Sequence, residues 1–136
     1  MYEITVQAEF AAAHALTIGG IVEPIHGHNW HVTVTIAGRT LDRDGLLCDF
    51  HTVHDHLLEI IEPFHNRNLN DAEAFKAMNP SAEHVALHIA RSLKDRLDDA
   101  LAPHAWVDSV RVTEAPGCAA TYRPDRTSGA RPPERA

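Results

Sequence analysis

Three histidines near the start of the chain have the residue type and spacing of a metal centre. His26 and His28 stand two positions apart, which in an extended segment places both imidazoles on one face. His14 has the same parity as the apolar face of an earlier alternating segment, so the three rings converge if the two segments pair as a hairpin. Taken alone, the His-x-His pair favours the alternative of two ordinary polar histidines at the start of a strand.

The donor set favours catalytic zinc over structural zinc. Three histidines leave a fourth position for water or substrate, whereas structural zinc usually takes four ligands rich in cysteine. The two cysteines, Cys48 and Cys118, are far apart and form no Cys-x-x-Cys pair, which is typical of a reducing compartment. A second group, His51, His54 and His56, is interpreted as solvated histidines on a helix because the third is turned away from the other two.

Four short segments are expected to form the strands that position these side chains. Residues 2–10 alternate between apolar and polar side chains, which predicts a half-buried strand. Residues 30–36 repeat the alternation with β-branched residues. Residues 109–114 and 119–122, separated by a Pro-Gly turn, predict two further strands.

Two amphipathic helices are expected between these pairs of strands. Asp49 can cap the first helix, which should end at Pro63. The second opens at Asn79-Pro80-Ser81, with proline at or near its first position, and carries an apolar stripe that reaches Leu97. The predicted element order is ββααββ, an α+β fold.

Composition describes a single domain of ordinary globular type, with 136 residues, 44% hydrophobic and 23% charged. Residues 1–123 are expected to form that domain, and residues 124–136, rich in Pro, Arg, Gly and Ser, a disordered tail. The formal net charge of −7 argues against nucleic acid as a partner. Because no apolar run suits a membrane span or a signal peptide, we expect a cytoplasmic protein with a small-molecule partner.

Several short motifs then occur in an order typical of one enzyme family. They are Phe10-Ala-Ala-Ala-His14, His26-Gly-His28-Asn29, Asp49-Phe50, Asn68-Leu69-Asn70, Asn79-Pro80-Ser81-Ala82-Glu83 and Thr113-Glu114. Together they resemble the 6-pyruvoyltetrahydropterin synthase and 6-carboxytetrahydropterin synthase family over residues 1–123. The resemblance implies the tunnelling fold (T-fold): an antiparallel four-stranded sheet with two helices, whose strands form a β-barrel in a homo-oligomer, a hexamer built as a dimer of trimers.

The resemblance also assigns roles to individual residues. The zinc ligands that it implies are His14, His26 and His28. It implies that Glu114 anchors the pterin ring, a task that suits a carboxylate because it accepts two parallel N–H bonds; the alternative is an exposed residue at a strand end. Ser81 and Glu83 are assigned to the substrate pocket, although Glu83 equally suits a first-turn residue that favours the helix dipole.

One departure from the family pattern concerns the catalytic cysteine. Most members carry it shortly before the His-x-His, and residues 15–25 contain none. Glu23-Pro-Ile-His26-Gly-His28 is similar to the signature of a subgroup in which glutamate replaces cysteine. In that subgroup 7,8-dihydroneopterin triphosphate is cleaved to 6-hydroxymethyl-7,8-dihydropterin, a folate precursor. Glu23 is therefore the candidate general base, against the alternative of a loop carboxylate before a proline.

A second departure is His65-Asn66, which stands where the family usually reads Asp-His. His65 is the candidate to act in place of the displaced histidine, and Arg67 is a candidate phosphate contact. The expected function is a zinc-dependent enzyme, a carbon-carbon or carbon-oxygen lyase, acting on 7,8-dihydroneopterin triphosphate. The alternatives are a 6-carboxytetrahydropterin synthase of queuosine-type pathways, a non-catalytic pterin-binding paralogue, and a zinc hydrolase with an unrelated substrate.

Overall fold

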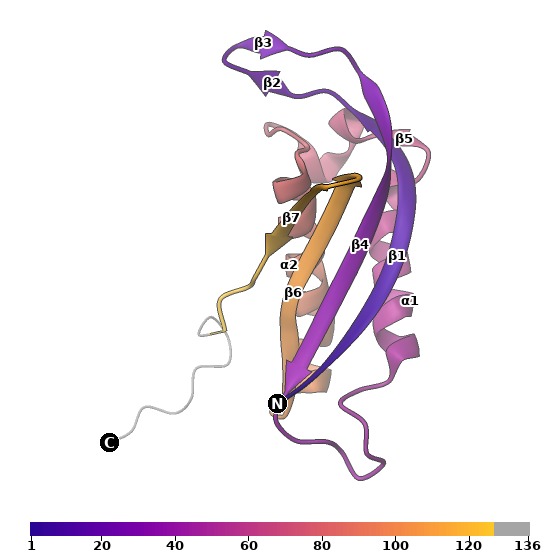
Figure 1. The fold of residues 1–136 in the computed structure, drawn as a ribbon, viewed down its shortest axis with the longest axis vertical. Coiled ribbons are helices and arrows are strands. Elements are labelled where there is room, and N and C mark those ends of the chain that lie inside the picture. The colour runs from indigo at the N-terminus through magenta and orange to yellow at the C-terminus, as the bar shows by residue number, and fades with distance from the viewer. Residues whose placement is uncertain (127–136) are drawn as a thin grey trace, which may run out of the picture.

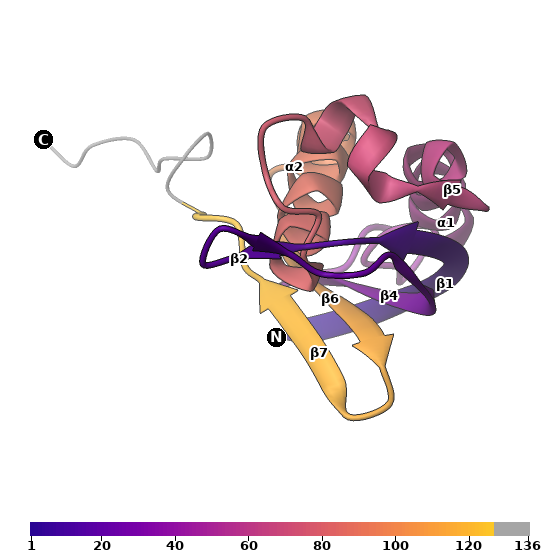
Figure 2. The same cartoon turned by 90° about the horizontal axis from the view of Figure 1, so that it is seen from above.

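The computed structural model describes residues 1–126 and shows a twisted sheet with two helices packed on one face (Figures 1 and 2). The strands are β1 (Tyr2–His14), β2 (Thr17–Ile18), β3 (Ile21–Val22), β4 (His26–Gly38), β5 (Arg67–Asn68), β6 (Ala105–Ala115) and β7 (Cys118–Tyr122). The helices are α1 (Phe50–Ile61) and α2 (Ala82–Leu101), and three single 3-10 turns are η1 (Glu62–Phe64), η2 (Leu69–Asp71) and η3 (Glu73–Phe75). The sheet order is β5-β1-β4-β6-β7, and β2 pairs with β3 in a separate projecting hairpin.

The long antiparallel hairpin of β1 and β4 forms the centre of the sheet. Its register runs without interruption from Tyr2 opposite Gly38 to His14 opposite His26. Even-numbered residues of both strands face the helices, because every second side chain of a strand points to the same side. Phe10 and Trp30 are an opposed pair on this face, with stacked rings 5.8 Å apart and almost no exposure.

The four predicted antiparallel strands are present, but the expectation of a purely antiparallel, four-stranded sheet needs correction. β5 adds a fifth, two-residue strand that pairs in parallel with β1 through Ala12 and Ala13, so the sheet is mixed. The two central strands are also longer than predicted. β1 continues past residue 10 through three alanines, which show no alternation, because β4 pairs with them all the way to His14.

Both helices begin where the sequence predicts, and the first also ends there. Asp49 accepts a hydrogen bond from the backbone N–H of His51 at 2.8 Å, and α1 ends before Pro63, which lies in the following 3-10 turn. Ser81 is the N-cap of α2 and accepts from the N–H of His84 at 3.2 Å. Pro80 therefore stands just before the cap instead of at the first helical position.

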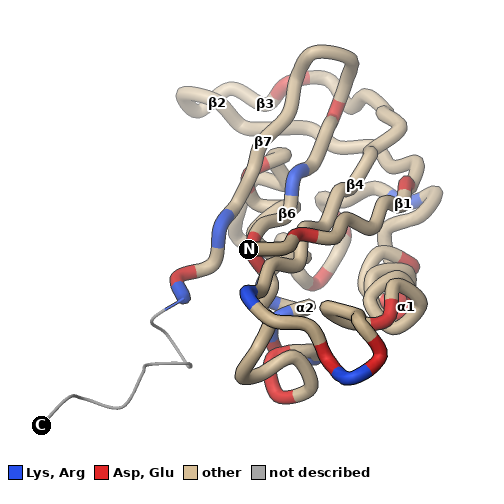
Figure 3. Tube along the Cα trace, turned by 60° about the horizontal axis from the view of Figure 1, so that its bottom comes forward, with Lys and Arg blue, Asp and Glu red and all other residues tan. Residues whose placement is uncertain are grey.

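The C-terminal part of the described chain stays against the sheet. Arg123 binds Asp108 at 2.7 Å, and the Arg126 guanidinium lies 3.6 Å above the ring centre of Trp106. Of the tail predicted at 124–136, residues 127–136 lie outside the described residues. Along the chain up to residue 126, Lys and Arg occur at separate places instead of in one patch (Figure 3), and none of the helices has the length and apolarity to cross a membrane.

Candidate metal centre

The hairpin register brings the three histidines of the first motif together. His14 is the last residue of β1 and faces His26, the first residue of β4, while His28 lies opposite Ala12. One ring nitrogen of each lies within 4.8 Å of the others. Within residues 1–126 this is the one group of three or more His, Cys, Asp or Glu side chains close enough to share a metal ion.

Backbone carbonyls fix the orientation of two of the rings. His14 Nδ1 lies 2.8 Å from the carbonyl oxygen of Pro80, and His26 Nδ1 lies 3.0 Å from that of Pro24. A carbonyl can only accept, so each Nδ1 must carry the proton and donate it. The Nε2 atoms are then free to present lone pairs; they lie 3.1 Å apart. Carbonyl support of this kind is typical of histidines that ligate a metal.

The third ring supplies an independent indication that something binds here. His28 Nε2 is buried and has no hydrogen-bond partner among the described residues. Burial lowers the pKa of His28, and the neighbouring Glu114 only partly opposes this effect. An orphaned polar atom costs about 1–3 kcal/mol, and a cation coordinated by the Nε2 lone pair would remove that cost. The donor set therefore fits a divalent ion that prefers imidazole, such as zinc.

An aromatic residue packs beneath the histidines. Trp30 is fully buried and meets His14 and His28 edge-on, with ring centres 4.9 Å and 5.8 Å away. Its indole N–H donates to the carbonyl of Ala12 at 3.1 Å, which ties the ring to β1. The buried indole ring thus packs against one side of the histidine cluster and keeps water from that side.

Two asparagine side chains hold the chain just after His14. Asn70 accepts from the N–H of Ala15 and donates to its carbonyl, both at 2.8 Å. Asn79 makes the same pair of bonds to Thr17, at 2.8 Å and 2.9 Å. Each side-chain amide thus makes the pair of backbone hydrogen bonds that a neighbouring strand would otherwise make. In the sequence, both asparagines were noted only as parts of the family motifs. They lie 55 and 62 residues from the backbone that they bind, so no local pattern indicates this role.

Two carboxylates face the cluster, one from strand β6 and one from the loop between β3 and β4. Glu114 Oε1 lies 2.9 Å from His14 Nε2 and 3.8 Å from His28 Nε2. Glu23 Oε1 lies 3.8 Å from His26 Nε2 and accepts the N–H of Leu16 at 3.0 Å. Both side chains are only partly exposed, at 26% and 31%. The structure thus brings both predicted acidic residues to the histidines.

The other predicted residues do not touch the histidines. Ser81 caps α2, and Glu83 is exposed in the first turn of that helix. His65 is exposed, and its Nδ1 accepts the N–H of Ala11 at 3.2 Å. Ala11 precedes His14 by three strand residues, or about 10 Å, so within one chain His65 stands apart from the cluster.

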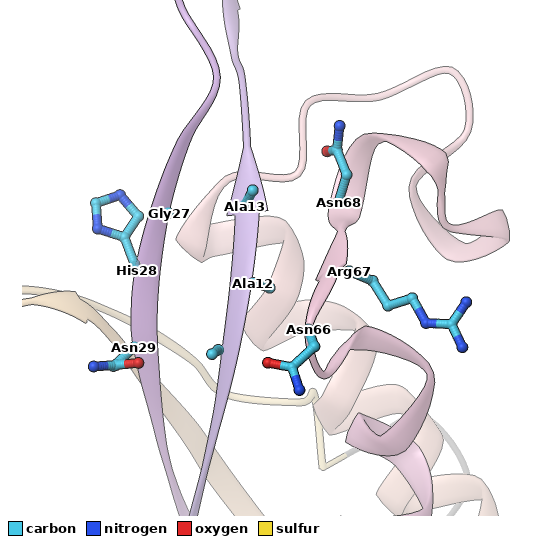
Figure 4. Close-up of a pocket in the computed structure, with 9 residues that line it drawn as sticks. Ala12, Ala13, Gly27, His28, Asn29, Asn66, Arg67 and Asn68 are labelled. Carbon is cyan, nitrogen blue, oxygen red and sulfur yellow. The ribbon is translucent and has the colours of Figure 1, made fainter.

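An open groove of about 580 Å³ lies beside the cluster, across β4, β1 and β5. Its floor is formed by small residues of β1 and β4, and His28 contributes to one end (Figure 4). Asn66, Arg67 and Asn68 line the other end. Figure 4 shows Arg67 extending away from His28, so the candidate phosphate contact occupies the rim of the groove.

Solved structures of similar fold are known. A catalytic-residue mutant of Plasmodium vivax 6-pyruvoyltetrahydropterin synthase superposes with a TM-score of 0.79 at 19% identity, covering 91% of this chain and 98% of that one. The Caenorhabditis elegans 6-pyruvoyl tetrahydropterin synthase gives 0.76 at 23% identity, covering 92% and 98%. These likenesses show that the chain has the T-fold.

Sequence comparison gives relatives over nearly the whole chain. The 6-carboxy-5,6,7,8-tetrahydropterin synthase of Bacillus subtilis is 30% identical over 138 aligned positions, covering 92% of this chain and 87% of the relative. The Rickettsia bellii protein of the same name is 25% identical, covering 87% and 97%. The family model described as 6-pyruvoyl tetrahydropterin synthase matches residues 3–125. The chain therefore belongs to the 6-pyruvoyl tetrahydropterin synthase family.

Proposed function

We propose that the protein is a zinc-dependent enzyme that cleaves the side chain of 7,8-dihydroneopterin triphosphate to leave 6-hydroxymethyl-7,8-dihydropterin. The observation that carries this proposal is the placement of Glu23. Its carboxylate is fixed by the N–H of Leu16 and faces His26 across 3.8 Å, at the position in the sequence where a thiol would otherwise be expected. Neither Cys48, beside the start of α1, nor Cys118, after β6, lies in the loop that carries Glu23.

His14, His26 and His28 would hold the zinc ion through Nε2. Bound there, zinc would polarise a hydroxyl of the substrate side chain. The buried ring of Trp30 excludes water beneath the site, and the carbonyls of Pro80 and Pro24 keep both supported imidazoles in the ligating tautomer. Glu114 is assigned to the pterin ring, because its carboxylate is only partly exposed and can accept two N–H bonds.

The reaction then needs one base and no external reductant. Glu23 accepts the proton of the hydroxyl on the second side-chain carbon, and that carbon becomes an aldehyde as its bond to the first carbon breaks. The electron pair passes to the first carbon, conjugated with the ring, and the proton returns there to give the hydroxymethyl group. The triphosphate leaves with the aldehyde. A carboxylate close to the reacting group is suited to both proton transfers.

A Plasmodium vivax family structure supports the role of the carboxylate. That protein is described as a catalytic-residue mutant in which a glutamate is replaced by alanine. We extend this to Glu23 of the present chain. The groove beside His28 and a hexameric assembly are the remaining parts of the proposal. His65 of the same chain is held at Ala11, so a part for His65 in the reaction would require a second copy of the chain.

The names of the sequence relatives favour a second function, the synthesis of 6-carboxytetrahydropterin. A non-catalytic pterin-binding protein is a third candidate, favoured by the separation of His65 from the cluster. The three differ in product, so the zinc-loaded protein should be incubated with 7,8-dihydroneopterin triphosphate and the oxidised pterins identified by mass spectrometry. We expect 6-hydroxymethylpterin. Carboxypterin would support the second function, and unchanged substrate with measurable binding the third.

The role of Glu23 has its own test. Glu23→Gln keeps the size of the side chain and removes the base, so turnover should fall about 100-fold or more while substrate binding persists. Glu9→Gln is the matched control, because Glu9 pairs with His31 on the opposite, open face of the sheet. Full turnover by Glu23→Gln would assign the proton transfers to another group.

A further inference from the structure

The end of β6 carries a carboxylate that lies beside the histidine cluster. Thr113 makes the last pairing of β6 with β4, and the pairing with β7 shifts register between Thr113 and Ala115, leaving Glu114 as an unpaired bulge residue. Glu114 has the same parity along β6 as the buried residues Val110 and Val112, so its side chain lies on the face of the sheet that carries the histidines. Its oxygen lies closer to a histidine ring nitrogen than that of Glu23 does.

The distances match those between ligands of one metal ion. Two ligands of a tetrahedral zinc ion lie about 3.4 Å apart, because each is about 2.1 Å from the metal. Glu114 Oε1 lies 2.9 Å and 3.8 Å from two of the Nε2 atoms, and His14 and His26 are separated by 3.1 Å. The carboxylate oxygen therefore occupies the place of a fourth ligand relative to His14 and His28.

Glu23 and Glu114 differ in their contacts outside the histidine cluster. Glu23 is bound by the backbone of Leu16, both through its side chain and through its own N–H at 2.9 Å. The contacts of the Glu114 carboxylate within the described chain are to the histidine rings themselves. Glu114 is therefore free to coordinate, and Glu23 is held beside the site.

We propose that Glu114 is the fourth protein ligand of the metal when no substrate is bound. This inference rests on the proposed metal centre and concerns the same site. One carboxylate cannot hold both the metal and the pterin ring, so binding of the ring would draw Glu114 away and open the fourth position to the substrate hydroxyl. The metal would thus be closed to water and small anions until a pterin arrives.

Cobalt(II) substitution tests this without measuring turnover. A cobalt-bound water ionises near neutral pH and changes the visible spectrum, whereas a carboxylate in the same position does not. We expect the visible spectrum of the parent protein to stay constant between about pH 6 and 9. Glu114→Gln should acquire a pH-dependent spectrum and bind azide about tenfold more tightly, because the tethered carboxylate no longer competes. Glu9→Gln, the control with equal loss of charge on the opposite face of the sheet, should behave as the parent does.

The possible outcomes distinguish a failure of the metal centre from a failure of Glu114 as its fourth ligand. A parent protein that binds no cobalt overturns the metal centre itself. A parent protein that binds cobalt and itself shows a spectrum that changes between about pH 6 and 9 overturns the fourth ligand alone. This measurement stands even if the variant does not fold. Saturating 6-methylpterin, an oxidised pterin without side-chain hydroxyls, should leave the fourth position to water and make the parent spectrum pH-dependent. A parent spectrum that does not change when 6-methylpterin is bound overturns the exchange.

Discussion

Replacing Asn70 by alanine tests whether one side-chain amide holds the histidine cluster in place. The substitution removes two hydrogen bonds of 2.8 Å to the backbone of Ala15, the residue after His14. Each bond contributes about 1 kcal/mol, and the N–H of Ala15 then loses its partner in a residue that is only 6% exposed. We therefore expect a loss of about 2–3 kcal/mol in the free energy of unfolding.

The matched control is Asn79→Ala, which removes the same pair of bonds from Thr17. Thr17 is exposed, so water can replace the amide and the loss should stay below about 1 kcal/mol. Urea unfolding of metal-free protein, at one protein concentration, would measure both as shifts of the midpoint at unchanged slope. Asn70→Ala should also weaken zinc binding about tenfold, as expected when support of a ligand is lost. Equal losses in the two variants, or none in Asn70→Ala, would refute the reasoning.

Three further predictions follow from single contacts. His28→Ala should abolish stoichiometric zinc, measured by elemental analysis, while His31→Ala on the open face should retain one zinc per chain. Ser81→Ala should cost about 1 kcal/mol in urea unfolding through loss of the α2 cap, and Ser81→Asp should restore it. Burial lowers the pKa of His88 from 6.5, so the unfolded chain binds the proton more tightly, and the metal-free protein should lose stability as pH falls below 6.5. His88→Gln should flatten that pH dependence, and an unchanged slope would exclude His88 as its source.

Local pattern was enough to predict the central strands and the convergence of the histidines. Parity along an extended chain relates His14 to the apolar face of its strand, and a hairpin needs no information from distant residues. The helix cap Asp49 was equally local, because capping depends on the side chain and the three residues that follow. The start of the second helix at Asn79-Pro80-Ser81 was local too, although Ser81 was not identified in advance as its cap. These features were readable because each depends on neighbours in the sequence.

The features that sequence reasoning missed depend on contacts between distant segments. The extension of β1 through Ala13 and the short parallel β5 exist because other strands pair with them, and neither has a pattern of its own. The bonds from Asn70 to Ala15 join segments 55 residues apart. The bulge at Glu114 likewise arises from a mismatch between two pairings of one strand. The residue could be named in advance, but not its approach to the histidine nitrogens.

The position of Trp30 makes its fluorescence a reporter of the histidine cluster. The indole ring is fully buried and touches two of the three imidazoles edge-on, so a cation placed among them would change the environment of the fluorophore directly. The other tryptophan, Trp106, lies under Arg126 and belongs to the region where the C-terminal segment meets the sheet. A Trp106→Phe protein would therefore carry a single tryptophan, at the cluster, and a Trp30→Phe protein a single tryptophan beside Arg126. The two fluorescence signals would report separately on the histidine cluster and on the contact between Arg126 and the sheet, without any added label.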